Sequence, residues 1–466
     1  MSVSQKSANV SPVPAVNDLD ARGLEALAYS TAVQAYLFAF PLVITERERL
    51  RREKLTAPVP FEPAAPINQL GHMTALSSAK GDLPFSPNVD TVYTGVSLDL
   101  TKEPIILDMP AIKDRYAVVH VVNAYVENQP YDYSPRTNGC DHAQIAYVGP
   151  DWQGDLPEGV IERRIDTNLA GIAVRIAAKD EADLEIVRGY QARMSLTPLS
   201  EWKDGPSGKL ATPPAPRHRN RYEGDFAWFR EAADLLGENP PPPGHKTVAT
   251  TLWRIGITPG QPFDPDALDP ATRQGILRAE RDGPAMMEYL LKNRGRKFPN
   301  GWDAARYSRD FTSDYAARAA AALVGLMGND PEEALYLYTY YDASGELLDG
   351  AKRYRIHIPA DRIPATSGIG FWSITMYGGR SFQFIDNPLD RYCVSSRDTL
   401  AANADGSVDI WVQGEAPGGG KDTNWLPSPK GGPFRVTFRI YSPVQRLVDE
   451  FFEMTLALPP LEPIAS

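Results

Sequence analysis

The sequence predicts a mixed α+β protein that is mostly β, with a helical region between two β-rich regions. Short apolar segments separated by Pro, Gly, Asn and Asp occupy residues 61–180 and again residues 351–466. This spacing is typical of β-sandwiches. Between them, residues 181–350 carry apolar side chains at helical spacing, interrupted by prolines. The 466 residues exceed one ordinary core, so several domains are expected.

The N-terminal segment is expected to be a tail followed by one helix. Residues 1–20 are polar and rich in Ser, Pro and Asn, which is typical of a disordered tail. Residues 21–60 form a helical segment, because apolar residues recur there at helical spacing and Asp20 can cap its start. We expect Pro41 to end or kink this helix, since proline lacks the N–H of an interior helical residue.

The N-terminal β-rich region opens with a clearly alternating strand. In TVYTGVSLDL, Val92 and every second residue after it share one face, and Tyr93 lies on the other. The later segment RYAVVHVVNAYVEN is nearly continuous in apolar residues, which indicates a strand buried on both faces. These segments and the turns between them predict an N-terminal β-sandwich.

The C-terminal region repeats the β pattern. In its last strand, FRVTFRIYSP, Phe434 and Phe438 lie on one face while Arg435 and Arg439 lie on the other. Short strands at this spacing predict a second sandwich of the jelly-roll type.

Composition argues against several classes of function. The net charge of −11 offers no broad basic surface for a nucleic acid. Cys140 and Cys393 alone do not make a disulfide framework. The N-terminus lacks the basic and apolar regions of a secretory signal, and no stretch reaches the roughly 18 consecutive apolar residues of a membrane span. We therefore expect a cytoplasmic protein without nucleic-acid or membrane partners, and a homo-oligomer remains open.

Motifs for metals, nucleotides and other cofactors are absent from the sequence. It contains no phosphate-binding G-x-x-x-x-G-K-[ST] and no strand-linked G-x-G-x-x-G. The six histidines are scattered and form no local pair of metal ligands. We therefore expect no cofactor and no metal, and a site built from polar and aromatic side chains.

The stretch SPNVDTVY supplies the catalytic candidates. Asp90 is a general acid/base candidate, Tyr93 can orient a ligand, and His72 is the nearest histidine along the chain. The structural alternative is a Pro-initiated turn in which Asp90 accepts backbone N–H bonds. Asp90 and Tyr93 have opposite parity, so they can serve one site only if Asp90 precedes the regular strand.

Three substrate-binding candidates lie near the C-terminus. Arg391, in FIDNPLDRY, can bind an anionic or carbonyl-bearing ligand, and its alternative is an internal ion pair with a neighbouring Asp. Asn424 and Trp425 lie in the Pro-rich NWLPSP. Asn424 can orient a carbonyl, and Trp425 either stacks on the ligand or packs over the end of the sandwich.

The two ends of the chain resemble two known families. INQLGHM, SPNVDTVYTGVSLDL and DRYAVVHVVNAYVEN resemble domain of unknown function 1254, while GFWSITMY, FIDNPLDRY and NWLPSPKGGPFRVTFRIYSP resemble domain of unknown function 1214. The resemblance covers most of residues 21–450 and implies an N-terminal immunoglobulin-like β-sandwich, a helical middle and a C-terminal jelly-roll β-sandwich. It implies no agreed reaction. It adds Asn68 and Tyr392 to the substrate-binding candidates. The family often has Asp where this chain has Asn123.

Two functions of different classes follow. The first is a metal-independent enzyme that acts on a small organic metabolite between the two β-domains, such as a tailoring enzyme of secondary metabolism. Hydrolysis is preferred for it, followed closely by isomerisation or cyclisation. The second is a non-catalytic protein that binds small molecules or carbohydrates, with Trp425 and Tyr93 stacking on the ligand. In a third, structural interpretation, the polar clusters only join the domains.

Overall fold

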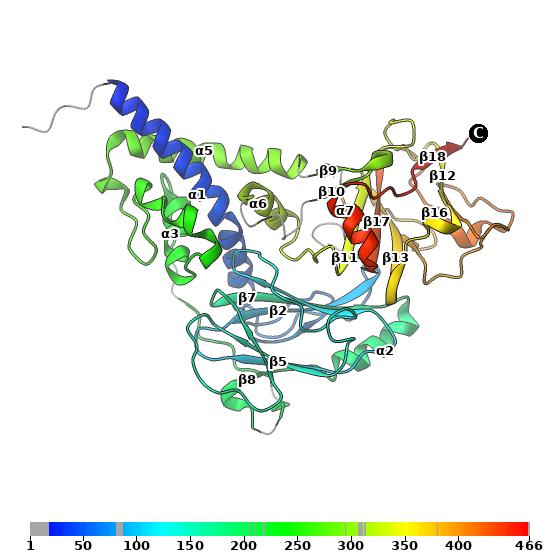
Figure 1. Ribbon diagram of the computed structural model, residues 1–466, viewed down its shortest axis with the longest axis horizontal. Coiled ribbons are helices and arrows are strands. Elements are labelled where there is room, and N and C mark those ends of the chain that lie inside the picture. The colour runs from blue at the N-terminus through cyan, green and yellow to red at the C-terminus, as the bar shows by residue number, and fades with distance from the viewer. Residues whose placement is uncertain are drawn as a thin grey trace, which may run out of the picture.

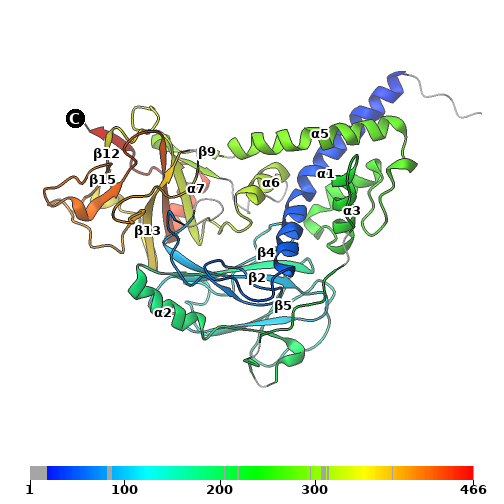
Figure 2. The ribbon, with the colours of Figure 1, turned by 180° about the vertical axis from the view of Figure 1, so that it is seen from behind.

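The protein is represented by a computed structural model that describes residues 18–464 except for 81–86, 204, 209, 218–219, 294, 306–310, 312–313 and 380. It is a mixed α+β protein, mostly β, as the sequence predicts. Figures 1 and 2 show one β-rich unit carrying the helices on one side and a second β-rich unit on the other, with α6 between them. Most of the expected tail, residues 1–17, lies outside the described residues, and residues 18–20 already belong to the first helix.

The N-terminal unit consists of two four-stranded sheets with a common apolar core. The first sheet has the order β1 (Gly71–His72), β2 (Thr91–Asp99), β7 (Leu169–Ala177), β4 (Ala117–Asn123). The second has the order β6 (Ile161–Arg164), β5 (Ala143–Val148), β3 (Ile105–Met109), β8 (Ser195–Pro198). Helix α2 (Glu181–Gln191) buries its apolar stripe in the same core. This unit therefore reaches residue 198, beyond the expected boundary at 180.

The helical layer is built around one long buried helix. It contains α1 (Asp18–Glu53), α3 (Ala227–Glu238), α4 (Lys246–Ala249), α5 (Pro270–Lys292) and α6 (Tyr315–Val324). Short 3₁₀ turns join many of the elements: η1 (Leu199–Glu201), η2 (Pro243–His245), η3 (Leu252–Ile255), η4 (Pro265–Ala267), η5 (Pro299–Gly301), η7 (Ala360–Arg362) and η8 (Asp422–Asn424). Helix α1 is long and apolar enough to cross a membrane, but 67% of its most apolar window is buried in the protein, which is typical of a core helix.

Pro41 is expected from the sequence to end or kink the first helix. It does not end the helix, because α1 continues to Glu53 with Pro41 inside it. The residues around Pro41, from Phe38 to Val43, are buried against α3, α5 and α6. Burial of several large apolar side chains, at about 2 kcal/mol each, outweighs the roughly 3 kcal/mol that an interior proline costs a helix.

The C-terminal unit also consists of two sheets over one core. The larger has the order β14 (Cys393–Ser395), β13 (Thr366–Gly378), β17 (Phe434–Pro443), β11 (Ala334–Thr339), β10 (Asp303–Ala305), β9 (Gly295–Lys297). The smaller has the order β16 (Trp425–Pro427), β15 (Val408–Gln413), β12 (Arg353–Ile358), β18 (Leu461–Ile464), and α7 (Gln445–Phe452) follows β17. The unit therefore begins at residue 295, well before the expected 351.

Strand β17 is buried along its whole length, on both faces. Its apolar face enters the core of the C-terminal unit, as its alternation predicts. Its opposite face, which carries Arg439 and Tyr441, is covered because the N-terminal unit packs on it: Tyr441 contacts Tyr116 of that unit at 5.3 Å between ring centroids. A polar strand face is thereby enclosed between the two units.

Candidate functional site

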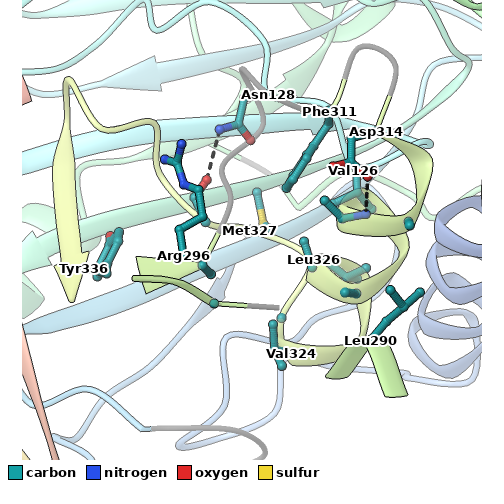
Figure 3. Close-up of a pocket in the computed structure, with 18 of the residues that line it drawn as sticks. Val126, Asn128, Leu290, Arg296, Phe311, Asp314, Val324, Leu326, Met327 and Tyr336 are labelled. Atoms are coloured by element: carbon teal, nitrogen blue, oxygen red, sulfur yellow. Dashed lines mark hydrogen bonds between the residues drawn. The ribbon is translucent and has the colours of Figure 1, made fainter. Parts of the chain in front are cut away.

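A cavity of about 540 Å³ lies at the junction of the two β-rich units and the helices. Strands β2 and β7, strands β11 and β17, and helices α5 and α6 all contribute to its wall. Figure 3 shows Leu290, Val324 and Leu326 together on one side, with Tyr336 and Arg296 on the other. The cavity thus has an apolar side and a polar side, within the size range of small-molecule sites.

Tyr93 and Arg175 form the centre of the polar side. They are direct partners across the antiparallel β2–β7 pair, so their side chains leave the same face of the sheet. The Arg175 guanidinium carbon lies 5.2 Å from the centroid of the Tyr93 ring. Burial by itself raises the pKa of the Tyr93 phenol, but the positive charge of Arg175 and the hydrogen bonds that the phenol receives outweigh burial. The net result is a pKa below the ordinary value of tyrosine.

Arg175 is held by neutral groups. Its Nη1 is 3.1 Å from Nδ1 of His120 and donates to Oδ1 of Asn329 at 3.0 Å, while Nη2 donates to the carbonyl of Met327 at 2.7 Å. Nε2 of His120 is 2.7 Å from Oδ1 of Asn128, so His120 donates through Nε2 and accepts through Nδ1. Burial, followed by the charge of Arg175, lowers the pKa of His120 to about 3 and keeps this imidazole neutral.

Asn88 links Tyr93 to a second buried group. The backbone N–H of Asp90 donates to Oδ1 of Asn88 at 2.6 Å, which fixes the orientation of the amide. Nδ2 then donates to the oxygens of Tyr93, at 3.3 Å, and Tyr441, at 3.0 Å. The Tyr441 hydroxyl in turn donates to Oδ2 of Asp90 at 3.0 Å.

The Asp90 carboxylate is buried directly behind the polar side of the cavity, in the bend that precedes β2. Ser373 donates to its Oδ2 at 2.6 Å, and Nη2 of Arg397 lies 3.7 Å from its Oδ1. Because Ser373 and Tyr441 belong to the C-terminal unit, Asp90 ties the two units together. Its backbone N–H bonds to Asn88, which in turn bonds to Tyr93. Asp90 itself is not one of the described residues that line the cavity.

Arg439 completes the polar side from β17. It is 5% exposed and donates from Nη1 to Thr375 at 2.7 Å and from Nη2 to the hydroxyl of Tyr377 at 2.7 Å. Tyr377 donates to the carbonyl of Pro87, in the turn before β2. The guanidinium is therefore anchored on its own sheet and on the entrance of the strand that carries Tyr93.

Two family models match the chain at its two ends. Residues 67–198 match the model of the DUF1254 family, and residues 333–445 match the model of the DUF1214 family. Both families are described as proteins of unknown function. The chain therefore carries a DUF1254 segment and a DUF1214 segment. The resemblance noted in the sequence is thereby confirmed. The cavity is shared between them, since Tyr93 and Arg175 belong to the DUF1254 segment and Arg439 to the DUF1214 segment.

The fold is shared with a solved structure. The crystal structure of the VPA0106 protein from Vibrio parahaemolyticus superimposes with a TM-score of 0.71 at 23% identity, covering 94% of this chain and 100% of that one. An uncharacterized protein from Burkholderia cenocepacia gives a TM-score of 0.42 at 11% identity over 95% of each chain, which is too low to support a conclusion. No curated protein matched the chain.

Of the catalytic candidates in the DUF1254 segment, the structure brings Tyr93 to the cavity and places Asp90 behind it. His72 is elsewhere. It pairs with Thr94 across β1 and β2, and its Nδ1 is 2.8 Å from the Thr94 hydroxyl. Thr94 points to the opposite face of the sheet from Tyr93, because alternate residues of a strand face opposite ways. His72 and Tyr93 are therefore separated by the sheet.

The candidates in the DUF1214 segment have structural partners away from the cavity. Arg391 donates to the carbonyls of Asp422 and Thr423, at 2.9 and 2.6 Å, in place of the ion pair considered above. Asn424 donates to the carbonyl of Ala401 and accepts from its N–H, each at 2.8 Å. Trp425 is 8% exposed within β16 and is not an exposed loop residue.

The remaining two substrate-binding candidates also have structural partners. Both groups of the Asn68 amide bond to the backbone of Asp99, at 2.8 and 3.1 Å, which secures the chain before β1. The Tyr392 hydroxyl donates to Asp390 at 2.9 Å, and its ring stacks on Phe384 with centroids 4.6 Å apart. Neither lines the cavity among the residues that the structure describes.

Sequence reasoning did not select Arg175, Arg439 or Asn88 as site residues. Arg175 is the one charged residue in the apolar segment GIAVRIAA, and Arg439 lies with Arg435 on one face of the strand FRVTFRIYSP. An arginine inside a mostly apolar strand is the signal that identifies both Arg175 and Arg439, because an arginine is rarely buried without a specific partner. Within the described part of the chain, no three His, Cys, Asp or Glu residues are grouped as a metal site.

Proposed function

We propose that this protein is a metal-independent enzyme that moves a proton on a small organic substrate bound in the junction cavity, with Tyr93 as the proton-transfer residue. The observation that carries the proposal is the position of the Tyr93 phenol. It faces the cavity, lies beside the cation Arg175, and receives a hydrogen bond from Asn88.

The lowered pKa of Tyr93 supports a role as a base. A tyrosine with a pKa below the ordinary value of about 10 is more readily deprotonated near neutral pH, and the phenolate that results can remove a proton from the substrate. Arg175, fixed by three neutral partners, stabilises that phenolate. Among the described lining residues, the other proton-exchanging side chains are Tyr336 and Asp314, and Asp314 caps helix α6 through the N–H of Ala317.

Isomerisation is the reaction class that uses these groups most directly. The Tyr93 phenolate takes a proton from a carbon next to a substrate carbonyl, and the electron pair moves onto the carbonyl oxygen as an enolate. A neighbouring cation stabilises that oxygen. When the substrate carries a β,γ double bond, the phenol then returns the proton to the γ-carbon and the double bond moves into conjugation with the carbonyl, so atoms and charges balance without a further reactant. Hydrolysis, the preference from sequence, would use the same base on water.

The finer features of the fold and the setting of the protein are also proposals. We propose immunoglobulin-like connections for the N-terminal unit and jelly-roll connections for the C-terminal unit, and the two-sheet construction of each unit supports them. We further propose a cytoplasmic protein whose partner is a small molecule, and the cavity at the junction supports the latter.

Hydrogen exchange into deuterated water tests the proton transfer. A panel of aryl- and alkyl-substituted keto acids is incubated with the wild type, with Tyr93→Phe and with Tyr289→Phe, an exposed tyrosine on α5 that serves as a matched control. Mass spectrometry then measures the deuterium gained at carbon. We expect the wild type and the control to catalyse exchange, and Tyr93→Phe to lose roughly a hundredfold or more.

Two results would count against the proposal. Exchange by Tyr93→Phe at the wild-type rate would remove Tyr93 from the chemistry. Binding of the panel by the wild type without any exchange would favour the non-catalytic binding protein, because the same cavity would then serve recognition alone.

A further inference from the structure

The positive charge of Arg175, on the polar side of the cavity, has no carboxylate close to it among the described residues. Arg175 is 5% exposed, and its hydrogen-bond partners among the described residues are an imidazole, an amide and a backbone carbonyl, all neutral. Among the described residues no carboxylate lies within 4 Å of it. The titratable side chains that act on it most strongly are tyrosines, Tyr93, Tyr336 and Tyr116. A buried cation without an anion is costly, and a bound anion would remove that cost.

Arg439 differs from Arg175 in having one anionic neighbour. Asp90 acts on it electrostatically, but both Ser373 and Tyr441 hydrogen-bond to that carboxylate, and Arg397 lies beside it. Among the residues that the structure describes, the hydrogen-bond partners of Arg439 are hydroxyl groups. Among the described residues, the polar side of the cavity therefore presents two nearly buried guanidinium groups, and the Asp90 carboxylate is already shared. Asp314, the carboxylate that lines the cavity, caps helix α6.

The opposite side of the cavity is apolar and is built from small residues. Helix α6 contributes Ala317, Ala320, Ala321 and Val324, which leave room beside the helix, and α5 contributes Leu290. In Figure 3, Leu290 and Val324 lie away from Tyr336 and Arg296. A ligand that fills both sides must carry an apolar body and a compact polar group at one end.

We infer that the ligand of this cavity is an organic anion, a carboxylate or sulfonate attached to an apolar body. Its anionic group binds Arg175 and Arg439, and its body packs along α6. Arginine suits this task because its planar fork matches the oxygens of such a group. The inference rests on the proposed function for the site, and it adds the chemical class of the substrate.

Binding of three matched probes tests the inference without turnover. Phenylbutyrate carries both features, phenylbutanol has the same body without the charge, and butyrate has the charge with almost no body. Calorimetry on the wild-type protein is expected to give the tightest binding for phenylbutyrate, by roughly tenfold or more over either of the others. Equal binding of phenylbutyrate and phenylbutanol would overturn the inference.

Variants locate the two halves of the site. Arg175→Met is expected to weaken phenylbutyrate on the order of tenfold to a hundredfold and to leave phenylbutanol unchanged. Ala321→Leu narrows the apolar side and is expected to weaken phenylbutyrate more than butyrate. Arg164→Met, at an arginine of the N-terminal unit with 41% of its side chain exposed, is the matched control and should match the wild type. Unchanged binding of phenylbutyrate to Arg175→Met or Ala321→Leu would place it elsewhere.

Binding of the probes and exchange of hydrogen are measured separately, so the ligand class and the proton transfer can fail independently. Circular dichroism checks the fold of each variant, and if Arg175→Met does not fold, the probe series on the wild type and Ala321→Leu still decide the matter. In Tyr93→Phe, phenylbutyrate should still bind more tightly than phenylbutanol, because Arg175 and Arg439 are unchanged. Preference for the anion together with exchange that survives in Tyr93→Phe refutes only the proton-transfer role. Loss of exchange in Tyr93→Phe without preference for the anion refutes only the ligand class.

Discussion

Replacement of His120 by Gln should remove a defined part of the pH dependence of stability. His120 is fully buried between Arg175 and Asn128, and its pKa falls from 6.5 to about 3 because of burial and the charge of Arg175. A pKa that is depressed in the folded state means that the unfolded chain binds the proton more readily. His120 therefore contributes stability that is complete above about pH 6.5 and is lost as the pH falls toward about 3.

The magnitude follows from the two pKa values. A depression from 6.5 to about 3 corresponds to at most about 5 kcal/mol, reached only when the folded state is also protonated. Between pH 7 and pH 5, about 2 kcal/mol of this should be lost. In His120→Gln this portion is absent, because the glutamine side chain does not titrate. The variant is less stable overall but loses about 2 kcal/mol less than the wild type over that interval.

Urea unfolding at pH 7 and pH 5 measures this difference. His142→Gln serves as the control, because the side chain of His142 is 57% exposed, and its Nε2 lies 2.9 Å from Oδ1 of Asp108. Other groups, including His72, whose pKa is also lowered by burial, are present in all three proteins and cancel in the comparison. If His120→Gln retains the full pH dependence of the wild type, the imidazole is not held neutral and the arrangement around Arg175 is wrong.

Three further predictions concern the packing and the buried hydrogen bonds that stabilise the fold. Gly275→Ala should destabilise the protein by roughly 1–3 kcal/mol in thermal unfolding, since the added Cβ would lie 2.6 Å from the carbonyl oxygen of Glu25 in α1. Gly189→Ala, in α2 with nothing within 4 Å, is its control and should be neutral or stabilising by up to about 1 kcal/mol. Asp90→Asn should lower the free energy of unfolding in urea by about 2–4 kcal/mol, because an amide N–H would face the hydroxyls that donate to the carboxylate. An unchanged urea midpoint would show that Asp90 does not hold the two units together. Trp425→Phe should lower the melting temperature and leave phenylbutyrate binding unaltered, and weaker binding would return Trp425 to the site.

Local pattern was enough to predict the type of most elements. The two-residue period of TVYTGVSLDL predicts a strand, and β2 spans Thr91–Asp99. The parity of Asp90 and Tyr93 also led to the correct expectation that both can serve one site only if Asp90 precedes the regular strand. Asp90 does lie in a bend before the strand, which allows both residues to contact the same Asn88. These features depend on neighbours in the chain, so the sequence contains them directly.

Long-range pairing decided which polar residues meet. Tyr93 faces Arg175 because of the register between β2 and β7, and Asn88 reaches Tyr441 because the C-terminal unit packs on the turn before β2. His72, Arg391 and Asn424 lie near turn-forming residues in the sequence, as Tyr93 does, so local pattern could not separate them from it. In the structure, however, their hydrogen-bond partners lie away from the cavity.

By itself, therefore, the sequence determined the α+β class, most of the element types and the pairing of a DUF1254 with a DUF1214 segment. The tertiary structure alone decided the site. Composition and period report how each residue relates to its neighbours along the chain, whereas a cavity depends on the packing of segments that are far apart. The burial of Arg175 and Arg439 beside Tyr93 is a property of that packing, and no local pattern specifies it.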